Sequence, residues 1–119
     1  MKLTRCEEIA ASDDDMPIWR CVEVGFDDYK NLVVHLDHDD YGDHRYDHDI
    51  YAAVDRDETF AMAEYLRVNT MDLPKAIYNE LGNKENYLLV PSDIEKIFQN
   101  ILEFVLDCGV HYRLRREQR

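Results

Sequence analysis

Apolar and polar residues alternate through residues 18–54, which read IWRCVEVGFDDYKNLVVHLDHDDYGDHRYDHDIYAAV. Such alternation places successive side chains on opposite faces of a β-strand. The pattern predicts three strands, over residues 18–24, 31–37 and 50–54. In the second strand, Leu32, Val34 and Leu36 share one apolar face. The simplest arrangement is an antiparallel meander, whose second hairpin carries a long, hydrophilic tip over residues 37–49.

The second half of the chain carries helix signals. Asp55 is a capping residue with Glu58 three positions later, and Ser92 opens a capping box with Glu95. We predict helices that start at these two caps, and a shorter helix between them. Glycines mark the ends, with Gly82 as a left-handed stop. The shorter helix is capped by Thr70 or Asp72 and runs through Leu81, and the last helix ends at Gly109. Residues 87–90 form a strand or a buried connection. Residues 110–114 form a final strand.

The order of strands, then helices, then a strand predicts an α+β fold. We expect one domain over residues 1–119, with a single antiparallel sheet of four to five strands packed by about three helices on one face. The chain has no internal repeat or low-complexity linker that would divide it.

Acidic residues outnumber basic residues 26 to 14, which gives a net charge of −12. The excess lies in the first half, and it repels phosphate backbones and anionic membranes while favouring basic partners or cations. Cysteine occurs three times without paired spacing, and the N-terminus has no apolar signal sequence. We therefore expect a reducing, cytoplasmic location.

Residues 35–49 are the most unusual segment, with aspartates, histidines and tyrosines interleaved. Tyrosines among carboxylates are typical of surfaces that bind arginine or lysine. The candidate partner-binding residues are Asp37, Asp39, Asp40, Tyr41, Asp43, Tyr46, Asp47, Asp49 and Tyr51. Imidazoles beside carboxylates also suit a divalent metal. The candidate ligands for this alternative are His35, His38, His44 and His48; a solvated hairpin tip without a ligand is the third interpretation.

The segment Met62–Ile77 contains the pattern A-x-x-L-x-V-N followed by Leu73 and Ile77. This spacing resembles the helix-turn-helix core of DNA-binding repressors, and the resemblance implies a DNA-binding regulator. Arg67 stands where such cores carry glycine, and Pro74 falls inside the helix that would read DNA. A helical hairpin that serves packing alone has the same spacing.

The chain ends on a basic stretch, residues 113–119. We expect a frayed terminus that aids solubility. The alternatives are contact with an acidic group, including the chain's own first half, and head-to-tail self-association.

No nucleophile motif or phosphate-binding loop occurs in the sequence, so we expect no enzymatic activity. The sequence favours a small acidic cytoplasmic protein that binds and inhibits a basic protein, such as a nuclease toxin, in the manner of an immunity protein. We expect no cofactor for this role. The alternatives are a protein that binds a divalent metal through residues 35–49 and the DNA-binding regulator.

Overall fold

The computed structural model describes residues 1–85 and 87–119, and its strands form one sheet in the order β1-β2-β3-β4-β5. Every neighbouring pair is antiparallel. The strands are β1 (Thr4–Ala11), β2 (Ile18–Phe26), β3 (Leu32–Asp40), β4 (His48–Val54) and β5 (Arg113–Gln118). The predicted α+β class, with one antiparallel sheet, is confirmed.

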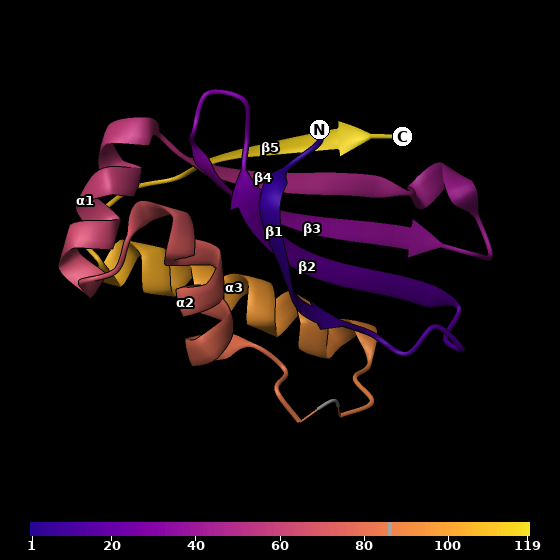
Figure 1. Ribbon diagram of the computed structural model, residues 1–119. Helices are drawn as coiled ribbons and strands as arrows, with labels where there is room; N and C mark the ends of the chain where they lie inside the picture. Colours follow the sequence, from indigo (N-terminus) through magenta and orange to yellow (C-terminus); the bar gives the residue numbers. More distant parts are fainter. Residues whose placement is uncertain (86) are drawn as a thin grey trace.

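The described helices lie on one side of the sheet (Figure 1). They are α1 (Arg56–Leu66), α2 (Leu73–Leu81) and α3 (Pro91–Asp107), with short 3-10 turns η1 (His44–Tyr46) and η2 (Thr70–Asp72). Helix α2 packs mainly against β1, and α3 packs mainly against β2. The sheet therefore has a helix-facing side and a second side, which we call the open face.

Apolar side chains of the central strands fill the space between sheet and helices. Leu32 and Val34 of β3 have no exposed surface, and they belong to the same core cluster as Ile77 of α2 and Ile101 of α3. Burial of this apolar area is the main force that holds the helix layer on the sheet.

The N-terminal residues fold over one end of the open face. A bulge in β1, with Arg5 in the left-handed region at φ 51°, turns the chain across β2. There the backbone of Thr4 passes so close to Gly25 that a Cβ on this glycine would lie 2.8 Å from the Thr4 carbonyl oxygen and 2.8 Å from Cys6 Sγ. Strand β1 was not among the predicted strands, because Thr4–Ala11 mixes charged and apolar residues without alternation.

Strand boundaries differ from prediction around residues 37–49. Strand β3 runs on to Asp40 and β4 starts at His48, so the connection is shorter than predicted. We call residues 41–47 the tip. The basic stretch at the other end is not frayed: it forms β5, which begins three residues later than the predicted strand 110–114 and pairs with β4.

Helix ends follow prediction at three of five caps, and Asp72, one of the two predicted alternatives, is the N-cap of α2. The Asp55 carboxylate accepts the Glu58 backbone N–H at 2.9 Å, and Gly109 is left-handed at φ 82°. Gly82 is not a left-handed stop, since its φ is −75°. Ser92 is not the cap of α3, which starts at Pro91.

The first turn of α3 is instead closed by Asp93, whose carboxylate accepts the Val90 backbone N–H at 3.0 Å. Residues 87–90, predicted as a strand or a connection, belong to the connection between α2 and α3.

Candidate functional site

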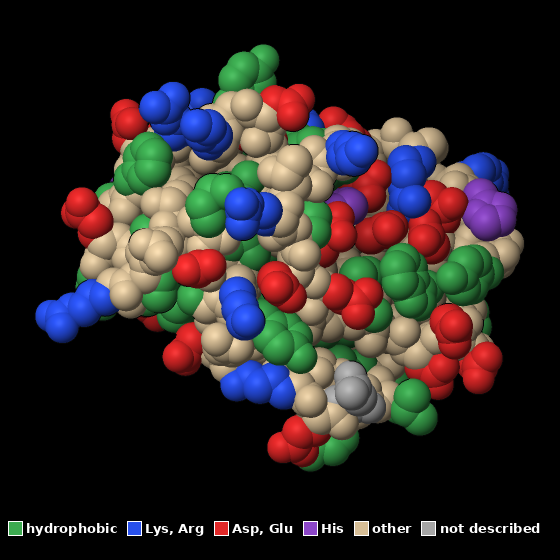
Figure 2. Space-filling view, in the orientation of Figure 1, with side chains coloured by type: hydrophobic (Ala, Val, Ile, Leu, Met, Phe, Trp, Pro, Cys, Tyr) green, Lys and Arg blue, Asp and Glu red, His purple; other side chains and the backbone are tan. Residues whose placement is uncertain are grey.

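Carboxylates from four strands gather on the open face. The register pairs Glu8 of β1 with Glu23 of β2, and Asp37 of β3 with Asp49 of β4. Alternation along β3 adds Asp39. We call these five residues the acidic face. Figure 2 shows acidic side chains gathered on the right-hand part of the visible surface, with a histidine among them and basic side chains along the upper border.

His35 lies at the centre of the acidic face, because the register places it between Glu23 and Tyr51. Its Nδ1 is 3.0 Å from Glu23 Oε1, and its Nε2 is 2.7 Å from Asp49 Oδ1. Both ring nitrogens can donate at once only in the imidazolium form. The ring also stacks on Tyr51, with centroids 4.5 Å apart, and the residue is buried. His35 therefore links carboxylates of β2 and β4.

Arg119 supplies a guanidinium to the acidic face. Its Nη2 lies 2.7 Å from a carboxylate oxygen of Asp37 and 2.7 Å from one of Asp39, and its Nε lies 3.3 Å from Asp49 Oδ2. Carboxylates that face each other across two strands repel. The guanidinium offsets that repulsion between Asp37 and Asp49, and it ties the end of β5 to β3.

Burial perturbs several groups on the open face. Burial, followed by the charge of Asp39, raises the pKa of Asp37. Burial, followed by the charge of Asp49, raises the pKa of Tyr51. Burial, followed by the charge of Glu8, raises the pKa of the Cys21 thiol well above its ordinary value. Cys21 is therefore held as a thiol that donates to Glu8 at 3.5 Å, and it has no nucleophilic character at neutral pH.

Three of the predicted binding aspartates shape the tip instead of facing outward unpaired. Asp40 accepts the backbone N–H groups of Gly42 and Asp43 at 2.9 and 3.1 Å. Asp47 accepts the backbone N–H of Asp40 at 2.7 Å. Asp43 forms an ion pair with Arg45 at 2.6 Å. These hydrogen bonds are the local turn contacts that aspartate favours.

The predicted tyrosines divide between surface and interior. Tyr41 and Tyr46 are 51% and 57% exposed at the tip. Tyr51 is 3% exposed and covered by His35, so it is not available as an anchor. Only the first two can contact a partner without a change in the sheet.

The predicted metal-ligating histidines do not converge. His35 is on the open face, whereas His38 and His48 stack on the helix-facing side with centroids 4.4 Å apart, and Arg20 donates to His38 Nδ1 at 3.0 Å. His44 is exposed at the tip.

Among the described residues, the group that brings three potential metal ligands within 4.8 Å of one another is Asp13, Asp14 and Asp15, outside the predicted segment. Metal binding by residues 35–49 stays a prediction, with no shared geometry to support it.

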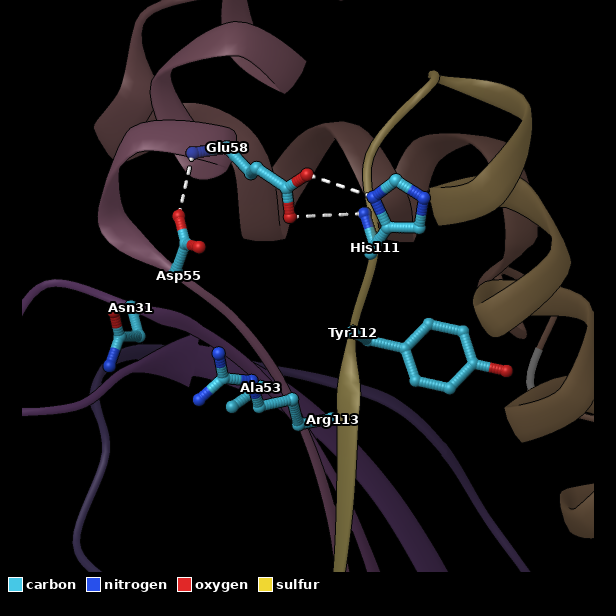
Figure 3. A pocket seen from close by; sticks show the side chains of 7 residues that line it. All are labelled: Asn31, Ala53, Asp55, Glu58, His111, Tyr112 and Arg113. Carbon is cyan, nitrogen blue, oxygen red and sulfur yellow. Dashed lines mark hydrogen bonds and ion pairs between the residues drawn. The ribbon is translucent and has the colours of Figure 1, made fainter.

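A hollow lies where α1 meets the start of β5 (Figure 3). Its volume is about 230 Å³, and it is lined by Asn31, Ala53, Asp55, Glu58, His111, Tyr112 and Arg113. Glu58 accepts the backbone N–H of His111 at 3.2 Å and its Nδ1 at 3.0 Å. The contacts between Glu58 and His111 fasten α1 to the chain leading into β5, and the imidazole is exposed.

The helix-turn-helix segment forms a helical hairpin made of α1, η2 and α2. Leu73, Pro74 and Ile77 of α2 are buried, and this helix packs mainly on β1. The side of α2 left for a ligand carries Lys75 as its basic residue together with the acidic Glu80. DNA binding stays a prediction that the placement of α2 does not favour.

Comparison with protein-family models, curated proteins and solved structures finds no match for this chain. No helix in the described part of the chain combines the length and the apolar character needed to cross a membrane.

Sequence reasoning missed Glu8 and Glu23. The alternative that the basic tail contacts the chain's own acidic first half is confirmed by Arg119, although the sequence did not identify the carboxylates it pairs with. Glu23 carried a signal, since it sits between Val22 and Val24 in a predicted strand and so must face away from the core. Arg119 is spaced by two residues from Glu117, as Glu117 is from Arg115 and Arg115 from Arg113. A strand through the tail would therefore place these four side chains on the same face.

Proposed function

We propose that this chain is a binding protein that engages a basic protein partner through the acidic face and the neighbouring tip. The observation that carries the proposal is the gathering of five carboxylates, Glu8, Glu23, Asp37, Asp39 and Asp49, on the one side of the sheet where no described helix packs. A sheet side covered by helices must be apolar, whereas this side is suited to charged contact.

Electrostatics decides the class of partner. At a net charge of −12, the chain repels nucleic acid and attracts basic surfaces. An enzyme that grips phosphates presents a basic cleft, and an acidic sheet face with a projecting tip can occupy such a cleft. The concrete form of the proposal is an inhibitor of a nuclease-like toxin, in the manner of an immunity protein, which needs no reaction of its own.

The tip supplies the apolar part of the surface. Tyr41 and Tyr46 are exposed beside the acidic face, and exposed tyrosines next to carboxylates are typical anchors for arginine-rich surfaces. The carboxylates then steer the encounter, and the tyrosines hold the complex.

The test compares two variants of equal net charge. Glu8→Gln with Glu23→Gln removes two charges from the acidic face, and Glu64→Gln with Glu103→Gln removes two from exposed helix positions. Each variant and the wild-type chain capture proteins from the native host's lysate, washed at about 0.1 M and then about 0.5 M salt. We expect one stoichiometric basic protein that the wild-type chain and the helix variant retain at the lower salt and the face variant loses.

Association rates measured on the captured protein complete the test. The face variant should associate about tenfold more slowly than the helix variant. Equal retention and equal rates for the two variants would remove the acidic face from the interface, and an empty capture by the wild-type chain would contradict the proposed function.

A further inference from the structure

The guanidinium of Arg119 lies in a pocket of oxygen atoms on the open face. Beyond its ion pairs with Asp37, Asp39 and Asp49, its Nη2 lies 2.6 Å from the backbone carbonyl oxygen of His38 and 3.2 Å from that of His48. Carboxylates and carbonyls only accept hydrogen bonds, and a guanidinium only donates them. The five oxygen acceptors and their spacing therefore form a built site for one planar cation. We call it the guanidinium pocket.

Arg119 does not exhaust the pocket. Nη2 carries two hydrogens but faces four oxygen atoms, from Asp37, Asp39 and the two carbonyls. The other terminal nitrogen, Nη1, makes no hydrogen bond or ion pair with a described residue. A guanidinium that presented both terminal nitrogens would satisfy more of these acceptors.

The walls of the pocket are more firmly held than its occupant. Asp37, Asp39 and Asp49 belong to β3 and β4, which have a strand on each side, and Asp49 is also fixed by His35. Arg119 follows the edge strand β5, is 39% exposed, and is attached there by one backbone hydrogen bond to the Asp47 carbonyl oxygen at 3.3 Å. The backbone pairing of β3 with β4 therefore holds the walls independently of this side chain.

We infer that the guanidinium pocket is an arginine-recognition site, which the chain's own Arg119 fills until an arginine side chain of the basic partner takes its place. The inference rests on the proposed function for the source of that arginine. Lysine suits the pocket less well, because an ammonium is a point charge that could take the position of Nη2 but could not also reach Asp49 Oδ2, which Nε contacts.

The spread of the acceptors also argues for a guanidinium over a metal ion. Within the described part of the chain, Asp13, Asp14 and Asp15 are the group whose ligand atoms lie within 4.8 Å of one another, and the three aspartates of the pocket do not form such a group. A divalent ion needs its ligands at about 2–2.6 Å from one centre.

The test empties the pocket and offers a small probe. Arg119→Ala is titrated with ethylguanidinium chloride, and equal concentrations of ethylammonium chloride control for charge and ionic strength. The matched control variant is Arg113→Ala, which removes an exposed arginine of β5 that has no ion pair with a described residue. Thermal melting and the backbone amide signals of Asp39 and Asp49 report binding.

We expect ethylguanidinium to raise the melting temperature of Arg119→Ala by about 3 °C at about five times its Kd, and to shift both amide signals in a saturable way. Ethylammonium should produce neither change, and Arg113→Ala and the wild-type chain should not respond to either probe. Circular dichroism checks that each variant folds. If Arg119→Ala does not fold, Arg119→Gln replaces it in the same titration.

An equal response of Arg119→Ala and Arg113→Ala to ethylguanidinium, or a response of Arg119→Ala to ethylammonium of the same size, would overturn the inference. Saturation by a divalent cation at lower concentration than ethylguanidinium would do so as well. These outcomes do not depend on the partner: a pocket that binds ethylguanidinium in a chain that captures no basic protein would contradict the proposed function and leave the recognition site intact.

Discussion

The two faces of the sheet are built from the same strands but held by different forces. On β3, Leu32, Val34 and Leu36 point into the helix layer and are buried, while His35 and Asp37 point to the open face and are held by ion pairs. Apolar packing is non-directional and tolerates small shifts, whereas a buried charge requires a specific partner of opposite charge at hydrogen-bonding distance. The first face stabilises the fold, and the second is specialised for ligand contact.

The largest expected effect comes from the helix-facing side. Leu32→Ala removes a side chain with no exposed surface from the central strand, which should lower the free energy of unfolding by about 2–5 kcal/mol. Urea denaturation measures the change. Leu114→Ala is the control, since Leu114 on β5 is 60% exposed and should change stability by less than about 0.5 kcal/mol. Similar losses for the two variants would mean that the helix layer does not pack on β3 as described.

On the open face, His35→Phe keeps a ring that can stack on Tyr51 and removes both ring nitrogens that contact Glu23 and Asp49. Since Asp49 is nearly buried and would keep, among the described residues, only its longer 3.3 Å contact with Arg119 Nε, the loss of its imidazole partner should cost about 2 kcal/mol. Urea denaturation again gives the value. Tyr51→Phe keeps the ring stack and deletes one hydroxyl, so it should cost less. If His35→Phe were neutral, ion pairs would not be what holds the open face.

This contrast separates what the sequence could predict from what it could not. Alternation at Leu32, Val34 and Leu36 predicts both faces of β3, because side-chain direction in a strand is local. The partners of His35 and Asp37 depend on register, which brings Glu23, Asp49 and Arg119 to them from distant parts of the chain. The acidic segment and the contact of the basic tail with it could therefore be proposed, but the individual partners and the division of the segment between sheet and tip could not.

The N-terminal cover of the open face offers the next test. Gly25→Ala places a methyl group 2.8 Å from the Thr4 carbonyl oxygen, so the segment over β2 must move away. We expect a loss of about 1–2 kcal/mol in unfolding free energy. In the matched control Gly42→Ala the new Cβ meets Asp40 Oδ1 at 3.4 Å on the exposed tip, and stability should hardly change. Equal stability of the two variants would show that the N-terminal segment does not pack on Gly25.

The two faces should also respond to acid with opposite sign, because burial acts oppositely on an imidazole and a carboxyl. On the helix-facing side, burial, followed by the charges of His48 and Arg20, lowers the pKa of His38, while Asp40 and Asp47 oppose the shift. The unfolded chain then binds this proton more readily, so stability is lost as the pH falls from about 6.5 towards the lowered value. His38→Gln should lose less stability than the wild type between pH 7 and pH 5 in urea titrations. An equal or greater loss would mean that His38 is not the source of this pH dependence.

Asp37, the residue next to His38 in sequence, faces the other way and has the smaller effect. Its pKa is raised by burial and by Asp39, so the folded chain takes up a proton before the unfolded chain does, and stability is regained as the pH falls from the raised value to about 3.8. The Asp37→Asn variant has no carboxyl to protonate at this position and so cannot regain that stability. Its unfolding free energy should fall more steeply than that of the wild type as the pH is lowered from about 5 to about 4. Asp28→Asn, at an exposed position outside the acidic face, should follow the wild-type curve. If Asp37→Asn followed it too, the carboxylates around Arg119 would be ordinary surface charges, and the open face would owe its stability to packing, as the helix-facing side does.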